Sequence, residues 1–282
     1  MNMYLVKCVS FLEKIGSENH LPERDELKIK TDGTSVRSIN IADHISMGQV
    51  SVPNILELSL IFMVFDSYLE SKDITLEGKT FRQKYNSLPK NDDLERIVST
   101  IYRVLKTYRN ATVHKMSSIT ANNTIVSIQY NFAGTCFKLE ISQKGIAVMK
   151  DFILCYFHYI ESSKVSKKYR YMLFSAYYND IYKEISLFED EDGDKSTLPI
   201  FSEVIDRYLR IDCYTINYSD DGNDLIFNIP DSFNDPSKNP IDVHFDYQGR
   251  DYLLPVEILG KTKKISIRNL SEWEIDLDLA KI

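Results

Sequence analysis

The stretch DLERIVSTIYRVLKTYRNATVHKM, residues 93–116, has the periodicity of an amphipathic helix. At about 100° per residue, its apolar side chains fall on one face of the helix and its polar side chains on the opposite face. The apolar face consists of Ile97, Val98, Ile101, Val104, Leu105 and Tyr108, and the polar face consists of Ser99, Arg103, Lys106, Asn110 and His114. We therefore predict a helix that packs through its apolar face and carries a basic, polar stripe.

Further helices are predicted on both sides of this stretch. Residues 54–72, NILELSLIFMVFDSYLESK, are apolar on almost every side of a helix, which suits the centre of a bundle or a subunit interface. Residues 146–162 and 170–188 also have helical patterns. A strand-like pair around Ala133-Gly134 lies between them and the basic helix. Residues 51–188 are thus predicted to form a mainly α-helical bundle with an inserted β-hairpin.

The remainder of the chain gives the overall class α+β. Residues 1–50 are predicted as a small α+β lead-in that includes a hairpin at 27–41. The acidic run EDEDGD at 189–194 marks the expected domain boundary. Residues 197–282 contain short β-rich segments separated by Asp, Asn, Gly and Pro, which predicts a small antiparallel C-terminal sheet domain.

Composition limits the class of protein. With 282 residues, 43% hydrophobic and 12% aromatic, the chain has enough apolar side chains for sizeable cores, and we expect two domains. The formal net charge of −7 argues against a protein that coats nucleic acid, because nonspecific binding depends on Lys and Arg. Positive charge is nevertheless concentrated in residues 94–118, which contain Glu95 as their one acidic residue.

We expect a cytoplasmic protein without a membrane segment. The longest apolar stretches fall well short of the roughly 20 residues that span a bilayer, and the N-terminus lacks the pattern of a signal peptide. The cysteines have no C-x-x-C spacing and no histidine at ligand spacing, so no metal is expected. No P-loop, dinucleotide, zinc-protease or serine-hydrolase motif occurs, and no cofactor is predicted. The four cysteines are Cys8, Cys136, Cys155 and Cys213.

The segment YRNATVHK contains Arg109-Asn110-x-x-x-His114 near the end of the basic helix. This pattern resembles the R-x(4–6)-H signature of the HEPN superfamily, in the form where Asn follows Arg. The resemblance covers the motif and its bundle setting, about residues 51–188. It implies a metal-independent endoribonuclease whose active site forms where two HEPN domains pack together, and a toxin or antiviral defence effector as the biological class. It says nothing about residues 197–282.

By this resemblance, Arg109 stabilises the scissile phosphate, His114 is the general acid or base, and Asn110 orients one of them. A guanidinium can hold a phosphate through two hydrogen bonds, and histidine as a residue type suits proton transfer near neutrality. On an ideal helix, however, Arg109 and His114 are about 140° apart. The helix must bend, Arg109 must reach around it, or a second subunit must complete the site. Arg103, Lys106 and Lys115 are the candidates for binding flanking phosphates.

The expected partners are RNA, a second copy of the chain through the helical domain, and a protein partner or trigger at the C-terminal domain. The alternative function is a noncatalytic HEPN-like interaction or RNA-binding module that uses the apolar helix 54–70. Two readings are open for Glu57: it pairs with Arg109 across the bundle, or it lies near a helix N-terminus where a carboxylate is favourable in any case.

Overall fold

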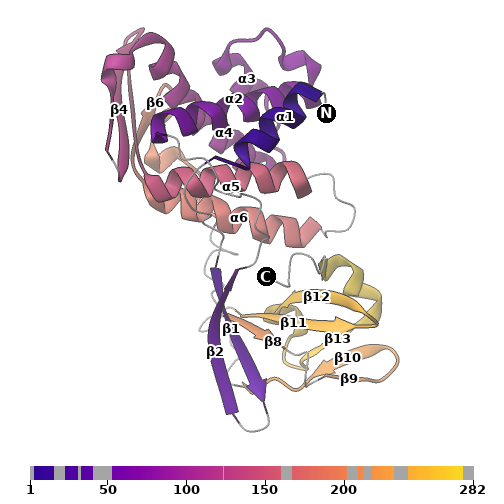
Figure 1. Ribbon diagram of the computed structural model, residues 1–282. Coiled ribbons are helices and arrows are strands. Elements are labelled where there is room, and N and C mark those ends of the chain that lie inside the picture. The colour runs from indigo at the N-terminus through magenta and orange to yellow at the C-terminus, as the bar shows by residue number, and fades with distance from the viewer. Residues whose placement is uncertain are drawn as a thin grey trace. The chain divides into compact units, whose positions relative to one another are not determined.

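The computed structural model describes residues 3–15, 23–30, 33–40, 53–122, 124–159, 167–201, 209–212, 218–231 and 241–275. The predicted α+β class is confirmed, because helices and three sheets occur in these residues (Figure 1). The chain divides into two compact units. The first consists of residues 1–20, 44–158 and 174–201, and the second consists of residues 21–43, 159–173 and 202–282.

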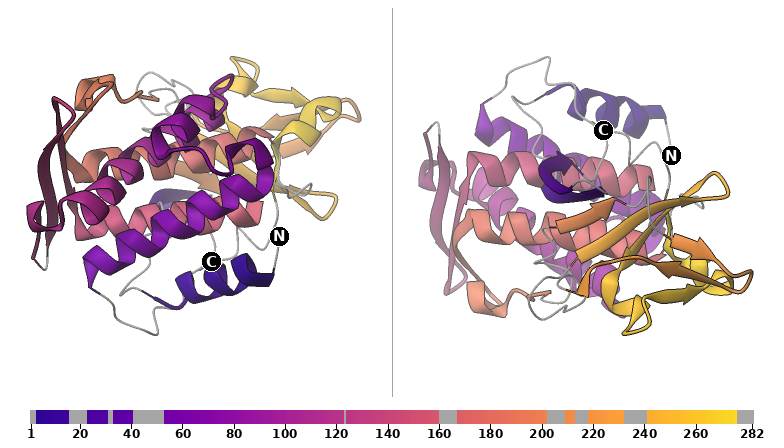
Figure 2. Two further views of the ribbon diagram at one scale, coloured as in Figure 1. Left: turned by 90° about the horizontal axis from the view of Figure 1, so that it is seen from above. Right: turned by 90° about the horizontal axis from the view of Figure 1, so that it is seen from below.

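The first unit is mainly helical. Its helices are α1 (Met3–Leu12), α2 (Asn54–Lys72), η1 (Ile74–Leu76), α3 (Phe81–Ser87), α4 (Asp93–His114), η2 (Met116–Ser118), α5 (Gln143–Tyr159), α6 (Lys167–Glu184), inside which the division falls, and η3 (Lys195–Thr197). Helix α2 contacts both α1 and α4, and α3 contacts α4. Figure 2 shows α5 and α6 side by side, and Phe152 and Phe174 form an edge-to-face pair between them.

Local sequence explains where these helices start. Asp92 caps α4 by accepting a hydrogen bond from the Glu95 backbone N–H. Thr80 and Gln83 form a reciprocal capping box at the start of α3. The residues predicted for the apolar face of α4, such as Ile97, Ile101 and Leu105, are buried. The predicted amphipathic helix at 93–116 is therefore confirmed to within two residues of its end.

A five-stranded antiparallel sheet completes the first unit. Its order is β3-β4-β5-β6-β7, with β3 at Ile119–Ala121, β4 at Ile125–Phe132, β5 at Thr135–Ser142, β6 at Ile185–Asp190 and β7 at Gly193–Asp194. The predicted hairpin is β4 and β5, joined by the two-residue turn Ala133-Gly134. One face of β4 packs on α4, where the Tyr130 hydroxyl donates a hydrogen bond to the Thr107 carbonyl at 3.3 Å.

The sheet corrects two sequence-based expectations. The helix predicted at 170–188 ends at Glu184, and residues from Ile185 continue as β6 because the free edge of β5 pairs with them. The acidic run at 189–194 is not a linker between domains. It forms the end of β6, a tight turn and β7, and it packs against α4.

The second unit is β-rich. Its larger sheet has the order β14-β12-β11-β8-β1-β2, and its smaller sheet has the order β13-β10-β9. The elements are β1 (Glu23–Lys30), β2 (Gly33–Asn40), β8 (Leu209–Asp212), β9 (Tyr218–Asp220), β10 (Asp224–Phe227), β11 (Ile241–Tyr247), β12 (Arg250–Pro255), α7 (Val256–Leu259), β13 (Lys264–Ser266), η5 (Ile267–Trp273) and β14 (Glu274–Ile275). A core that includes Phe227, Phe245 and Trp273 packs β10, β11, β12, α7, β13 and η5 together.

This unit differs from the predicted domain in two respects. The hairpin assigned to the N-terminal lead-in is β1 and β2, and β1 pairs with β8 from the C-terminal part of the chain. The larger sheet is also mixed rather than antiparallel, since β8 runs parallel to both β1 and β11. The sequence LPIFSEVIDRYLR, residues 198–210, also predicts a short helix, but most of it falls on 202–208, outside the described residues. Among the helices that are described, none has the length and hydropathy of a membrane span.

Candidate functional site

The motif residues lie in the last two turns of α4. The helix continues without a break to His114, and the Lys115 backbone N–H closes its last turn on the Ala111 carbonyl at 2.8 Å. Asn110 and His114 are therefore i,i+4 neighbours, and Arg109 keeps the angular separation from His114 that an ideal helix gives. A bend in α4 does not bring the two together.

Arg109 is directed toward α3. Its guanidinium carbon lies 4.6 Å from the centre of the Phe81 ring at the first residue of that helix, and its side chain is half-buried. Within the described ranges of the chain, Arg109 forms no ion pair with a carboxylate. Its charge thus lies against an aromatic face without a carboxylate from these described residues, which leaves hydrogen-bond donors for an anionic ligand.

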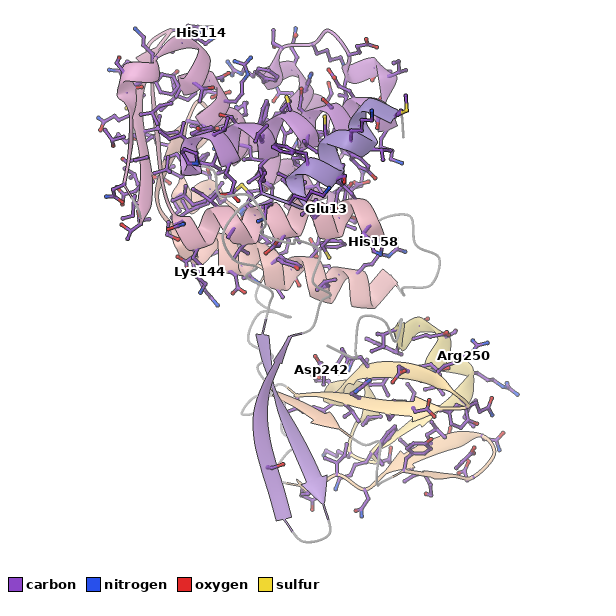
Figure 3. All side chains as sticks on the ribbon, viewed as in Figure 1. Glu13, His114, Lys144, His158, Asp242 and Arg250 are labelled. Atoms are coloured by element: carbon purple, nitrogen blue, oxygen red, sulfur yellow. The ribbon has the colours of Figure 1, made fainter. Side chains whose placement is uncertain are left out.

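His114 is directed toward the β4–β5 hairpin. Its imidazole stacks on the Phe132 ring with a centroid separation of 5.8 Å and an interplanar angle of 15°. Both side chains are exposed, and Figure 3 shows His114 at the end of the helical unit beside this hairpin. Phe132 has the same strand parity as Tyr130, so it extends the α4-facing side of β4 beyond the packed core. The stacking restrains the imidazole without burying it.

The predicted catalytic residues are therefore only partly brought together. Asn110 shares one side of the helix with His114 and is half-buried. Arg109 contacts α3 and His114 contacts β4, which are different elements of the unit. Within one chain, the Arg109 guanidinium and the His114 imidazole therefore lie on separate parts of the α4 surface.

Two of the three predicted phosphate-binding residues are buried instead. The Arg103 guanidinium donates to both carboxylate oxygens of Asp190 and to the Thr197 hydroxyl. Lys106 is fully buried, and its ammonium forms an ion pair with Glu191. Because the β6–β7 turn covers this part of the basic stripe and supplies compensating carboxylates, neither cation is accessible to a phosphate.

Lys115 is the exposed member of the predicted phosphate-binding set. It follows His114 directly, and its backbone caps the end of α4. Its exposed ammonium, one residue along the chain from His114, is accessible, unlike the charged groups of Arg103 and Lys106.

The acidic turn also contains a cluster of three carboxylates. Among the described residues, it is the one cluster of this size that could hold a metal ion. Ligand oxygens of Asp190, Glu191 and Asp192 lie within 4.8 Å of one another. Asp190 and Glu191 already neutralise Arg103 and Lys106. The cluster is therefore explained by pairing with the buried cations, and it does not require a metal ion.

Glu57 does not pair with Arg109. Its carboxylate lies 3.5 Å from the ammonium of Lys150 on α5, and Lys150 also donates a hydrogen bond to the Ile15 carbonyl at 2.9 Å. Burial raises the pKa of the Glu57 carboxyl, and Lys150 opposes that shift. Glu57 lies in the first turn of α2, as the second reading expected. Its pair with Lys150 links α2 to α5 and does not orient the motif.

Two aromatic residues of the site, Phe81 and Phe132, were not predicted. Phe81 is the first residue of α3, and Phe132 directly precedes the hairpin turn. Turns favour Gly, Pro, Asn, Asp and Ser, so a phenylalanine directly beside a turn is unusual. This was the one feature of the sequence that could have pointed to Phe132. For Phe81, the contact with Arg109 depends on how α3 packs on α4, which the local pattern does not encode.

Comparison with known proteins gave no match. No family model, curated protein or solved structure is detectably similar to this chain. Inference about its function therefore depends on the residues of α4 and their surroundings.

Proposed function

We propose that the protein is a metal-independent endoribonuclease of HEPN type, in which Arg109, Asn110 and His114 form the reactive half-site of each chain. The proposal is supported by a difference among the cations of α4. Arg103 and Lys106 are buried and paired with carboxylates, whereas Arg109 has an aromatic neighbour and His114 is exposed. Of these four residues, Arg109 and His114 are thus the ones that keep their donors available.

The proposed chemistry uses the ribose 2′-hydroxyl as the nucleophile. His114 accepts the 2′-hydroxyl proton as the oxygen attacks phosphorus, or donates a proton to the departing 5′-oxygen. Arg109 stabilises the negative charge that develops on the phosphoryl oxygens. The products are a 2′,3′-cyclic phosphate and a free 5′-hydroxyl, and the proposed steps use neither a metal ion nor a cofactor.

A second copy of the chain is part of the proposal. Arg109 and His114 contact different elements, so one chain presents them in different directions. If two α4 ends face each other across a two-fold axis, Arg109 of one chain approaches His114 of the other. Two equivalent composite sites then form, each with both required groups.

Incubation of purified protein with total RNA in excess EDTA tests the proposal. The wild type is expected to cleave RNA and leave cyclic phosphate ends, and Arg109→Ala and His114→Ala are expected to leave it intact. Arg96→Ala is the matched control, because Arg96 is an exposed cation at the other end of the same helix. Equal cleavage by all three variants, or RNA left intact by the wild type, contradicts the proposal.

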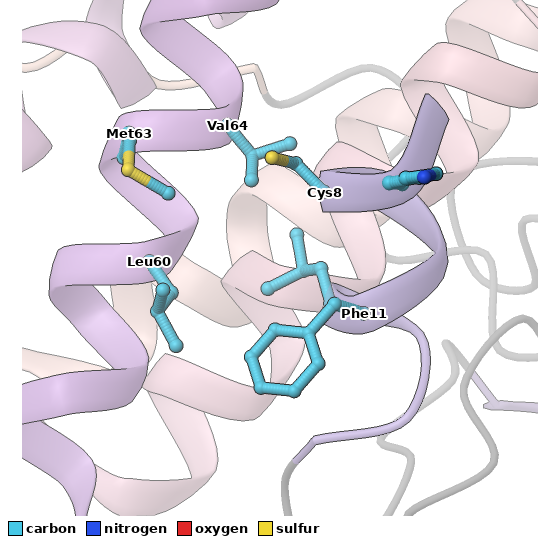
Figure 4. A pocket seen from close by; sticks show the side chains of 7 residues that line it. Cys8, Phe11, Leu60, Met63 and Val64 are labelled. Atoms are coloured by element: carbon cyan, nitrogen blue, oxygen red, sulfur yellow. The ribbon is translucent and has the colours of Figure 1, made fainter. Parts of the chain in front are cut away.

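A second candidate function is a noncatalytic interaction module that self-associates through α1 and α2. Phe11, Leu56 and Met63 on these helices are between 40% and 48% exposed. Between the helices lies a pocket of about 250 Å³, lined mainly by apolar side chains that include Leu60 and Val64 (Figure 4). An exposed apolar face of this kind marks an association surface, and a two-fold axis allows it to pair with itself.

Light scattering distinguishes this candidate. Met63→Glu is expected to convert a dimer to a monomer, whereas Ile74→Glu leaves the dimer intact, because Ile74 is exposed on η1 and lies outside this face. An interaction module keeps its association when Arg109 and His114 are both replaced by alanine and has no RNA cleavage to lose.

A further inference from the structure

We propose that Phe132, at the tip of the β4–β5 hairpin, is a stacking platform for an unpaired RNA base, and that the site therefore selects single-stranded RNA. This inference rests on the proposed function and names its substrate class. Phe132 is 54% exposed although its ring is large and apolar. The two preceding residues of the same strand face, Ile128 and Tyr130, are buried. Phe132 thus extends beyond the core in which Ile128 and Tyr130 are buried.

The ring of Phe132 is held in a defined orientation. His114 lies against it with nearly parallel planes, and the short turn Ala133-Gly134 follows directly. A restrained ring loses little conformational freedom when a base stacks on it, and aromatic residues in strands at such positions are used in this way by proteins that bind single strands. With His114 beside one side of the ring, the exposed area of Phe132 accommodates a second planar group.

The charge around the hairpin tip suits a polyanion. No Asp or Glu occurs from Arg96 to Lys138, although the chain contains 41 acidic residues. The end of α4 and both strands at the β4–β5 turn come from this segment. Lys115 is exposed beside His114 and can pair with a phosphate that adjoins the stacked base. No carboxylate from this segment therefore repels an RNA phosphate near Phe132.

Stacking on Phe132 requires a base that is free of a helix. A base inside a duplex is already stacked on both sides, and its faces are not available to a side chain. The base on Phe132 would place its nucleotide next to the imidazole that the proposed mechanism uses. Selection of unpaired RNA and alignment of the reacting nucleotide then follow from the same contact.

The experiment is fluorescence anisotropy with a labelled oligoadenylate of roughly ten nucleotides. The 2′-hydroxyls are methylated, because a 2′-O-methyl group blocks cleavage and leaves binding as the only readout. Phe132→Ala is expected to weaken binding roughly tenfold, and Phe132→Trp to retain or strengthen it. Ile125→Ala is the matched control, since Ile125 is an exposed apolar residue at the other end of β4. A duplex of the same length is expected to bind weakly to all variants.

The outcomes separate the inference from the function on which it rests. Wild-type affinity in Phe132→Ala overturns the stacking platform, and the ribonuclease proposal then stands or falls on its own cleavage assay. If Phe132→Ala changes the molar mass in light scattering and not RNA affinity, the ring contacts protein and the inference is wrong. With unmethylated RNA, the platform predicts that Phe132→Ala raises KM and also lowers kcat, because the reacting nucleotide loses its alignment beside His114.

Discussion

The Arg103 guanidinium on α4 donates two hydrogen bonds to the Asp190 carboxylate at the end of β6, although 87 positions separate the two residues. The Arg103 side chain is 5% exposed and the Asp190 side chain is fully buried. Arg103 also stacks on the Phe188 ring at 5.1 Å. This pair fixes the acidic turn on the helix that carries the motif, and it removes Arg103 from contact with solvent.

Loss of Arg103 is expected to destabilise the protein strongly. Arg103→Ala leaves the buried Asp190 carboxylate with a weaker partner, and breaking a buried ion pair on one side costs about 3–5 kcal/mol in the free energy of unfolding. Arg96→Ala, which removes an exposed pair with Asp93 on the same helix, should cost less than about 1 kcal/mol. Urea denaturation compares the two variants. Similar losses for both would mean that Asp190 is not dependent on Arg103.

Stability is expected to fall in alkaline solution. Burial raises the pKa of Tyr108 to about 12, and it also raises the pKa values of Tyr102, Tyr130 and Tyr178. In the unfolded chain, tyrosine ionises near pH 10. Above that pH, the folded state binds more protons than the unfolded state, so the free energy of unfolding decreases as pH rises.

Denaturant titrations between about pH 9 and pH 12 measure this decrease, which begins near the pKa of unfolded tyrosine and continues to that of folded Tyr108. The Tyr108→Phe variant should show a shallower decrease than the wild type, because phenylalanine has no proton to lose. The variant should also be somewhat less stable at neutral pH, since the Tyr108 hydroxyl donates a hydrogen bond to the Ile55 carbonyl. Identical pH slopes for the two proteins would contradict the assignment of the shift to Tyr108.

The hairpin turn offers a stabilising substitution. Ala133 has a φ of 50° and Gly134 has a φ of 83°, and Phe132 pairs with Thr135 on either side of them. A two-residue turn with two positive φ values favours Asn-Gly, and alanine is unfavourable in the left-handed region. Ala133→Asn is therefore expected to raise the free energy of unfolding by about 0.5–1 kcal/mol. Thermal unfolding tests this, and a lower Tm would contradict the turn geometry.

Local sequence predicted the helices at 54–72 and 93–116 and the β4–β5 hairpin. The first is a long, nearly uniform apolar stretch, and the other two each bury a face that repeats within their own sequence. The partners of those faces were not predictable. The polar stripe of α4 predicted a solvent-facing side of the helix. It gave no indication that β6 and β7 cover Arg103 and Lys106 on that side. By its sequence alone the acidic run is typical of a solvated linker, because the sequence does not show that it pairs with buried cations of α4.

The other differences between the predictions and the structure come from contacts between segments that are far apart in the sequence. The β1–β2 hairpin has a recognisable turn signal, whereas its parallel pairing with β8 joins segments that lie far apart in the sequence. In the candidate site, Arg109 and His114 were identified from the motif alone. Phe81 and Phe132, which determine where these two side chains point, contact them from other elements. A pattern within one helix contains no information about such neighbours.

The last prediction concerns the chemical form of the charge at position 109. Arg109→Lys keeps the positive charge and loses both the forked donors and much of the planar stacking on Phe81. If Arg109 stabilises the phosphoryl oxygens, the variant should cleave RNA about 100-fold more slowly, in the range found for removal of one transition-state donor. Its free energy of unfolding should change by less than about 1 kcal/mol, because the ring contact is partly exposed. Single-turnover cleavage and urea denaturation are measured on the same preparation. Full activity in Arg109→Lys would show that charge alone is required, and a large loss of stability would assign Arg109 a structural role instead.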